Sequence, residues 1–281
     1  MTESQPAQKA SRAGRNLPAA IAVGVILGGG LIATLIFAPR GWVAIVAVAM
    51  AVGTYEVVRR LREGGYDIPL IPLLVGGQAM VWLTWPFREV GALGSFGATV
   101  VVCLIWRLLS QGLASQPVNY LRDVSVTIFL AAWIPLFGAF GALLIYHDDG
   151  WARVFALMLG VVFSDIGGYV AGVLFGKHRM VPAISPKKSW EGFAGSLICG
   201  TTAAVLAVIF LLHKPAWVGI PLGVMLVLTA TLGDLVESQV KRDLGIKDMG
   251  TMLPGHGGLM DRIDGVMPSA VATWLVLTLL T

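Results

Sequence analysis

The chain has 281 residues, of which 56% are hydrophobic and 13% charged, and its mean hydropathy is +0.80. Soluble domains carry about 25% charged residues, so this composition excludes an ordinary soluble protein and indicates an integral membrane protein. The net charge of +4 is small, and we expect no nucleic-acid partner. Cys103 and Cys199 lie in apolar stretches without the paired spacing of a metal site, which favours buried, unpaired thiols.

Residues 1–16 are polar and basic, and we interpret them as a disordered cytoplasmic tail. They do not begin a signal peptide, because the apolar stretch that follows is as long as a full membrane span of about 20 residues. We predict an all-α, polytopic membrane protein with about nine transmembrane helices. The predicted spans are 17–38, 42–58, 68–85, 91–109, 124–146, 151–176, 191–212, 216–240 and 262–281. We divide them into an N-terminal bundle (17–150) and a catalytic region (151–281) with a polar site at its cytoplasmic face.

The lysines and arginines are distributed unevenly between the predicted loops. With a cytoplasmic N-terminus, sixteen of the 20 fall in cytoplasmic segments and four in outer ones, as the positive-inside rule requires. This topology places the C-terminus outside. The segments rich in polar motifs then all face the cytoplasm, where a soluble nucleotide can reach them. We expect the protein in the inner membrane of a bacterium.

Carboxylates gather in the last two predicted spans. Asp234 and Glu237 are three residues apart, and Lys241 follows four residues later, so all three share one helix face. An interfacial Glu237–Lys241 salt bridge is the simpler alternative, but it leaves Asp234 unexplained. Asp261 and Asp264 repeat the spacing at the start of the last span, where a helix N-terminus could also account for Asp264. Charges at this depth cost about 2.5–3.5 kcal/mol each and indicate function, and hard oxygen ligands favour Mg²⁺ or Mn²⁺.

A glycine-rich segment, L-P-G-H-G-G at 253–258, lies between these two carboxylate pairs. Its glycines allow backbone N–H groups to approach an anion, and it leads into a predicted helix N-terminus. Lys247, His256 and Arg262 flank or belong to it, which suits a phosphate site. His256 alone could equally be a structural histidine.

A second polar segment, S-P-K-K-S-W-E-G at 185–192, could bring the ammonium groups of Lys187 and Lys188 to a triphosphate. Two adjacent lysines could also serve only to orient the chain in the membrane. Asp165 lies within the sixth predicted span, on the same helix face as Tyr169. Glu56 precedes Arg59 and Arg60 by one helical turn, and there we predict a structural ion pair.

These segments together resemble a known family signature. The runs S-Q-V-K-R (238–242), K-D (247–248), L-P-G-H-G-G (253–258) and D-R-I-D (261–264) closely resemble the signature of phosphatidate cytidylyltransferases, also called CDP-diacylglycerol synthases. The segments 185–192 and G-D-L (233–235) resemble further motifs of that family, and the specific similarity covers roughly residues 160–265. The resemblance implies that CTP and phosphatidic acid react at the bilayer to give CDP-diacylglycerol and pyrophosphate, with Mg²⁺ required.

The resemblance also implies residue roles. Asp234 and Asp261 would hold the metal and, with Lys187 and Lys241, form the catalytic set. The implied substrate-binding residues are Ser185, Lys187, Lys188, Lys241, Arg242, Lys247, His256, Gly257, Gly258 and Arg262. Secondary candidates are Asp165, Glu237 and Asp264. We expect Mn²⁺ to substitute for Mg²⁺, and we keep a monovalent cation and a homodimer as candidate partners.

Two alternatives stay open from the sequence. One is a cytidylyl or phosphoryl transferase that acts on another lipid acceptor, such as an isoprenoid. The other is an ion-coupled transporter, because intramembrane carboxylates also line ion pathways. A transporter has no need of a basic, glycine-rich cytoplasmic loop, and we detect no inverted repeat in the sequence.

Overall fold

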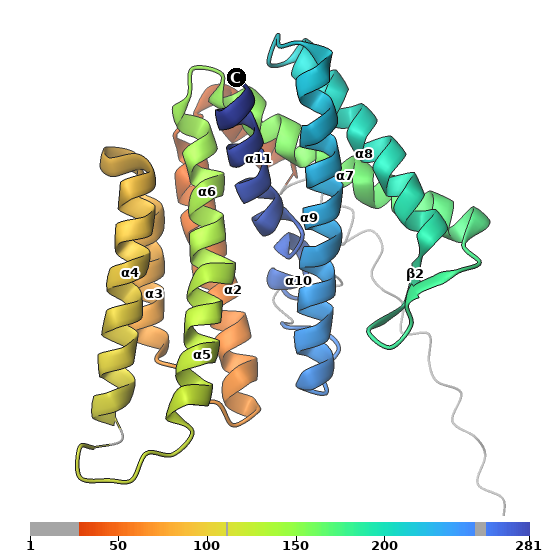
Figure 1. Cartoon of the computed structure of the whole chain (residues 1–281). Coiled ribbons are helices and arrows are strands. Elements are labelled where there is room, and N and C mark those ends of the chain that lie inside the picture. The colour runs from red at the N-terminus through yellow and green to blue at the C-terminus, as the bar shows by residue number, and fades with distance from the viewer. Residues whose placement is uncertain (1–27, 111, 251–256) are drawn as a thin grey trace, which may run out of the picture.

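The structure is a computed structural model that describes residues 28–110, 112–250 and 257–281 (Figure 1). After a short helix at Gly28–Phe37, the elements of the first half are α2 (Gly41–Glu63), α3 (Leu70–Trp82), α4 (Thr84–Ser110), α5 (Tyr120–Ala131), the π-helical turn η1 (Ala132–Leu136), α6 (Phe137–Leu143) and the 3₁₀ turn η2 (Leu144–Tyr146). Those of the second half are α7 (Gly150–Phe175), β1 (Arg179–Val181), β2 (Ser185–Ser189), α8 (Trp190–Phe210), α9 (Ala216–Asp243), α10 (Met260–Ile263) and α11 (Val266–Leu280).

Within the described residues, seven helices are long and apolar enough to cross a membrane. They confirm a polytopic, mostly helical membrane protein. The predicted span 68–85 is only the 13-residue helix α3, and of the span 17–38 the described part is the short helix Gly28–Phe37. The count of nine and the sidedness therefore stay predictions, as does the division at residue 150. The predicted tail 1–16 lies outside the described residues.

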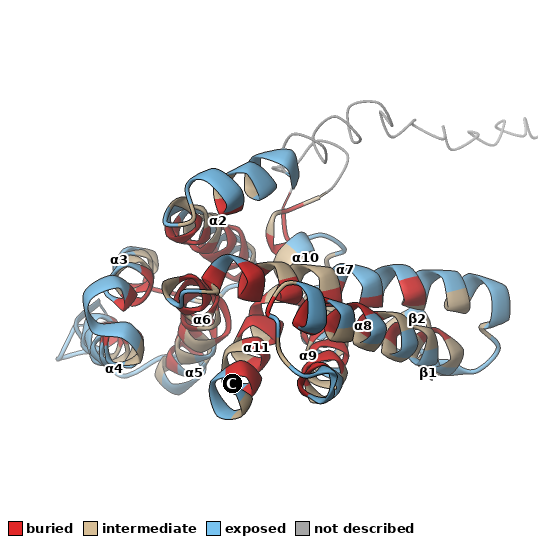
Figure 2. Cartoon of the chain, turned by 90° about the horizontal axis from the view of Figure 1, so that it is seen from above, coloured by how far each residue is buried: buried red, intermediate tan, exposed pale blue. Residues whose placement is uncertain are grey.

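The helices form two groups with α11 between them. Seen from above, α2, α3 and α4 lie to one side and α7, α8 and α9 to the other, while α11 packs against α6, α7 and α9 (Figure 2). Buried residues concentrate around α6 and α11, and exposed ones cover the outer helix faces (Figure 2). This arrangement brings the acidic start of the last helix beside α9 and α7.

The helices α7 and α8 pass each other at very short range, as the small residues of span six allow. A Cβ atom added at Gly167 would lie 2.5 Å from the carbonyl oxygen of Gly195, and one added at Gly195 would lie 2.5 Å from that of Gly167. Only glycine permits this approach at both positions. The crossing holds Asp165 of α7 close to the segment that precedes α8.

The segment before α8 is a short antiparallel β-hairpin, so the all-α prediction needs correction there. Strand β1 pairs with β2, with Arg179 opposite Ser189 and Val181 opposite Ser185. Strand β1 has only three residues and β2 is polar throughout, so neither carries a hydrophobic alternation that a sequence could reveal. The hydroxyl oxygen of Ser189 accepts a hydrogen bond from Gly192 N at 3.1 Å and caps α8.

The last predicted span is also not a single helix. It divides into α10 and α11 at Asp264 and Gly265, where the Asp264 carboxylate accepts a hydrogen bond from Gly265 N at 2.8 Å. Asp264 thus lies one residue before Gly265, the N-cap of α11, so a helix N-terminus still accounts in part for its position. The break turns α10 into a short polar segment that faces α9.

Candidate active site

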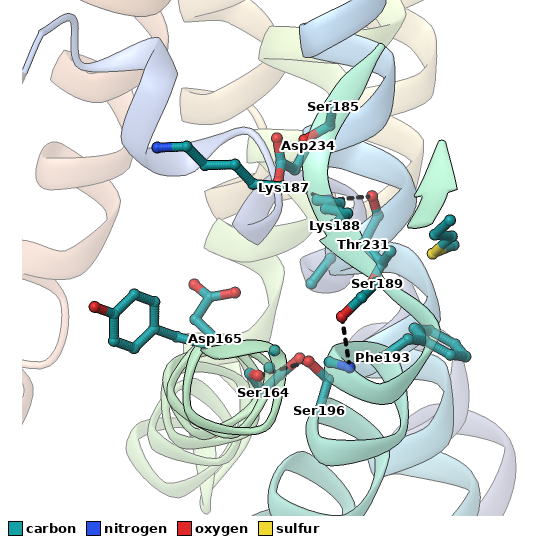
Figure 3. Close-up of a pocket in the computed structure, with 16 residues that line it drawn as sticks. Ser164, Asp165, Ser185, Lys187, Lys188, Ser189, Phe193, Ser196, Thr231 and Asp234 are labelled. Carbon is teal, nitrogen blue, oxygen red and sulfur yellow. Dashed lines mark hydrogen bonds and ion pairs between the residues drawn. The ribbon is translucent and has the colours of Figure 1, made fainter. Parts of the chain in front are cut away.

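Two cavities adjoin at the end of the bundle that carries the hairpin. The first has a volume of about 360 Å³ and lies between α7, the hairpin, α8 and α9 (Figure 3). Its polar lining residues are Ser164, Asp165, Tyr169, Ser185, Lys187, Lys188, Ser189, Ser196, Thr231 and Asp234. Hydroxyl and ammonium groups make up most of this polar lining.

The second cavity has a volume of about 340 Å³ and lies between α7, α9 and the α10–α11 break. Its charged lining residues are Asp165, Asp234, Glu237, Lys241, Asp261, Arg262 and Asp264. Asp165 and Asp234 line both cavities, so they stand between the space that holds Lys187 and Lys188 and a carboxylate-rich one. Phosphates and the cations that neutralise them require such a pairing.

Lys188 joins the hairpin to α9. Its Nζ lies 2.7 Å from Asp234 Oδ2 and donates to the carbonyl oxygen of Thr231 at 3.4 Å. The Asp234 side chain keeps 43% of its surface exposed, so it remains open to a ligand from the cavity. Lys187, on the same strand, is exposed and lines the first cavity (Figure 3).

Lys241 bridges two carboxylates in the second cavity. Its Nζ lies 2.6 Å from Glu237 Oε2 and 2.9 Å from Asp261 Oδ1. The Glu237–Lys241 salt bridge of the simpler alternative is thus present, but Asp261 of α10 completes it. Asp261 Oδ2 also accepts hydrogen bonds from Gly258 N at 2.9 Å and Met249 N at 3.0 Å. The side chains of Glu237 and Asp261 are 1% and 8% exposed, so this cluster is largely removed from water.

The other predicted site residues divide into three groups. Arg262 and Asp264 line the second cavity with Asp261. Arg242 is exposed, and its Nε donates to the carbonyl oxygen of Ile184 at 3.3 Å, which holds the hairpin turn. Lys247 is also exposed and lines neither cavity. Gly257 and Gly258 lie beside Asp261, where Gly258 donates its N–H to the carboxylate. His256 lies outside the described residues.

The donor atoms of the second cavity are mostly carboxylate oxygens, which suit a hard divalent cation. In the three described segments, no group of three or more histidine, cysteine or acidic side chains is gathered closely enough to form a metal centre by itself. The second cavity nevertheless offers carboxylate oxygens from Asp165, Asp234, Asp261 and Asp264, and the buried Glu237 Oε1 has no hydrogen-bond partner among the described residues. Oxygen donors suit Mg²⁺, and a cation at Asp234 would compete with Lys188.

Glu191 lines neither cavity but supports the hairpin beside the first, and the sequence assigned it no role. Its carboxylate accepts hydrogen bonds from Lys177 N at 3.2 Å and His178 N at 3.2 Å, and His178 Nδ1 lies 2.6 Å from its Oε1. It therefore anchors the start of the hairpin that carries Lys187 and Lys188. The one feature of the sequence that could have indicated this role is the position of Glu191 inside the polar segment 185–192.

Comparison with known proteins agrees with this geometry. A sequence model described as "Cytidylyltransferase family" matches residues 18–280. The chain belongs to the cytidylyltransferase family. It is 66% identical over 287 residues to a phosphatidate cytidylyltransferase of Mycobacterium leprae, covering 98% of this chain and 92% of the relative.

Further relatives extend this result. A phosphatidate cytidylyltransferase of Mycobacterium bovis is 65% identical, with 99% of this chain and 94% of the relative covered. One from Staphylococcus haemolyticus is 29% identical, with 84% of this chain and 92% of the relative covered. Family membership identifies the chain as a nucleotidyltransferase and confirms the family resemblance found in the sequence.

Proposed function

We propose that this chain transfers the cytidylyl group of CTP to phosphatidate at the cytoplasmic face of the inner membrane, with Mg²⁺ as cofactor. The observation that carries the proposal is the junction of the two cavities at Asp165 and Asp234. One cavity supplies ammonium and hydroxyl groups for phosphates, and the other supplies carboxylates. The relatives with the highest identity above are named for this reaction.

The reaction joins two anions. An oxygen of the lipid phosphate monoester forms a bond to the α-phosphorus of CTP, the bond from that phosphorus to the β-phosphate oxygen breaks, and pyrophosphate leaves. The monoester is already ionised near neutral pH, so no strong general base is needed. The chain's task is to cancel repulsion and to stabilise charge on the leaving group.

Lys187 and Lys188 line the first cavity and would bind phosphate oxygens there, while Arg262 lines the second. Asp234 and Asp261 would hold Mg²⁺, with Asp165 and Asp264 as neighbouring donors. When bound, the metal supplies Lewis-acid stabilisation of phosphate charge. Lys241 orients Asp261 through their 2.9 Å contact, and Arg242 steadies the hairpin turn. A monovalent co-ion, His256 and Lys247 as phosphate contacts, and a homodimer remain predictions.

The test uses purified protein in lipid–detergent micelles with CTP labelled at either the α- or the γ-phosphate. Phosphatidate and an isoprenyl phosphate compete as acceptors, with Mg²⁺, Mn²⁺ or chelator present. We expect the α-label in a CDP-lipid made from phosphatidate and the γ-label in pyrophosphate. A γ-label in the lipid, preference for the isoprenoid, or no labelled lipid would overturn the proposal. Inside-out vesicles that fail to use added CTP would contradict the assigned membrane face.

A further inference from the structure

Glu56 lies in α2, about two hundred residues before the site in sequence, yet it contacts the backbone next to Asp261. Its Oε2 accepts a hydrogen bond from Met260 N at 3.0 Å, and the residue is only 5% exposed. The predicted ion pair with Arg59 and Arg60 is therefore wrong. Both arginines instead pair with Glu63 at 3.1 and 2.8 Å, because α2 turns Glu56 into the bundle.

Arg60 makes a second contact of the same kind, one helical turn further along α2. Its Nε donates to the carbonyl oxygen of Met249 at 3.0 Å. The N–H group of Met249 in turn donates to Asp261 Oδ2 at 3.0 Å. The helix α2 thus holds both Met260, which precedes Asp261, and Met249, which bonds its carboxylate.

The backbone closes tightly around Glu56. A Cβ atom added at Gly258 would lie 2.7 Å from Glu56 Oε2, and one added at Gly250 would overlap Oε1. Glycine at these two positions lets the carboxylate sit against both backbone segments. The fit is specific to this pair of segments, which are the ones that hold Asp261.

Stability alone is a poor explanation for Glu56. Glu56 Oε1 is buried and has no hydrogen-bond partner within the described segments, and a buried, incompletely paired carboxylate weakens a fold more often than it strengthens it. What the side chain does provide is a fixed acceptor for one N–H group beside a site residue. A fixed position for the backbone beside Asp261 matters to catalysis, because small displacements of reacting groups lower the reaction rate strongly.

We propose that Glu56, supported by Arg60, is a positioning residue that fixes Asp261 and its N–H donors at the edge of the second cavity. The kinetic part of its test rests on the proposed cytidylyl transfer. Glu56 is not a lining residue of either cavity, so it acts through Met260 and Asp261 rather than on substrate. It makes the N-terminal helices part of the catalytic apparatus.

The kinetic test compares Glu56→Ala, Glu56→Gln and the neighbouring Arg59→Ala. We expect Glu56→Ala to lower kcat about 10-fold or more, with both KM values nearly unchanged, because placement rather than binding is lost. Glu56→Gln should recover most of kcat, since its amide oxygen still accepts from Met260 N. Arg59 is exposed and, in the part of the chain that the structure describes, pairs with Glu63 alone, so its variant should keep wild-type kinetics.

A coupling test adds Gly250→Ala. The added Cβ overlaps the Glu56 carboxylate, so Gly250→Ala should lower kcat more in the wild type than in the Glu56→Ala background. Additive losses in kcat would contradict direct contact between the two positions as the source of the effect.

Amide hydrogen exchange provides a readout that needs no turnover. In Glu56→Ala, exchange should rise in a peptide over residues 257–263 and stay unchanged in one within α9. Unchanged exchange with wild-type kcat would overturn the proposal. A rise across α9 and α11 with a matching fall in melting temperature would also overturn it, as a general loss of stability. If the wild type makes no CDP-lipid, the proposed function fails while the exchange comparison still decides the role of Glu56.

Discussion

Lys188 of the β-hairpin and Asp234 of α9 form an ion pair in which Nζ lies 2.7 Å from Oδ2. The pair connects the segment that carries the proposed phosphate-binding lysines to the helix that carries the acidic cluster. It also stands at the boundary of the two cavities, both of which Asp234 lines. A ligand that carries phosphates and a divalent cation would draw these two charges apart, the ammonium group toward phosphate and the carboxylate toward metal.

Asp261→Asn should lower kcat by about 100-fold or more at saturating substrates and Mg²⁺, because the amide cannot balance the charge of the cation or of Lys241. Folding should be near normal, since Asn keeps an oxygen that accepts from Met249 or Gly258. The rate of CDP-lipid formation measures the loss of activity, and the elution profile in size-exclusion chromatography checks that the variant is folded. Asp148→Asn, in an exposed loop remote from both cavities, is the control and should remain fully active. Full Mg²⁺-dependent turnover in Asp261→Asn would disprove the metal assignment. Asp234→Asn should behave in the same way.

Lys187→Ala should raise the KM for CTP about 10-fold and leave the KM for phosphatidate nearly unchanged, because a hydrogen bond to a charged phosphate contributes about 1.5–3 kcal/mol. The lysine is exposed on β2 and lines the first cavity. Steady-state kinetics with each substrate varied in turn measures the effect. Lys214→Ala, between α8 and α9, is the matched lysine control. An effect confined to the lipid KM would contradict the assignment of Lys187 to CTP.

Glu191→Ala should raise the KM for CTP even though Glu191 does not contact phosphate in our proposal. The reason is that the hairpin loses its acceptor for Lys177 N and His178 N. We expect a higher KM for CTP in Glu191→Ala and a smaller change in Glu191→Gln, which keeps an acceptor oxygen. Equal defects in both variants would indicate that the negative charge matters rather than the backbone anchor.

Lys241→Met should destabilise the protein by about 3 kcal/mol, since it leaves Glu237 and Asp261 largely buried without their shared cation. Thermal unfolding in detergent measures the loss. Adding Glu237→Gln should restore much of the stability but not the activity, because Asp261 still lacks the Lys241 contact that orients it. A melting temperature equal to that of the wild type in Lys241→Met would show that the bridge contributes nothing to folding.

The sequence predicted those parts of the site that follow local rules. Asp234, Glu237 and Lys241 share a helix face through their three- and four-residue spacing, and all three line the second cavity. The apolar segments likewise predicted the helices, although α3, which continues through Pro72, Gly76 and Gly77, is too short for a full span.

The features that were missed depend on contacts between distant segments. Glu56 and Met260 are 204 residues apart, and no local pattern distinguishes their contact from the i+3 and i+4 ion pairs that Glu56 could have made. The hairpin was missed because its strands are held by Glu191 and by the ion pair of Lys188 with Asp234 rather than by an apolar face. Tertiary contacts thus decide the orientation of side chains whose residue types the sequence already singled out.

The most direct measurement is the location of Mn²⁺ by anomalous scattering in crystals grown with a non-hydrolysable CTP analogue. We predict an anomalous peak within coordination distance of Asp234 or Asp261, with the analogue's phosphates reaching Lys187 and Lys188. A peak remote from both carboxylates, or phosphates bound outside the two cavities, would contradict the proposed site.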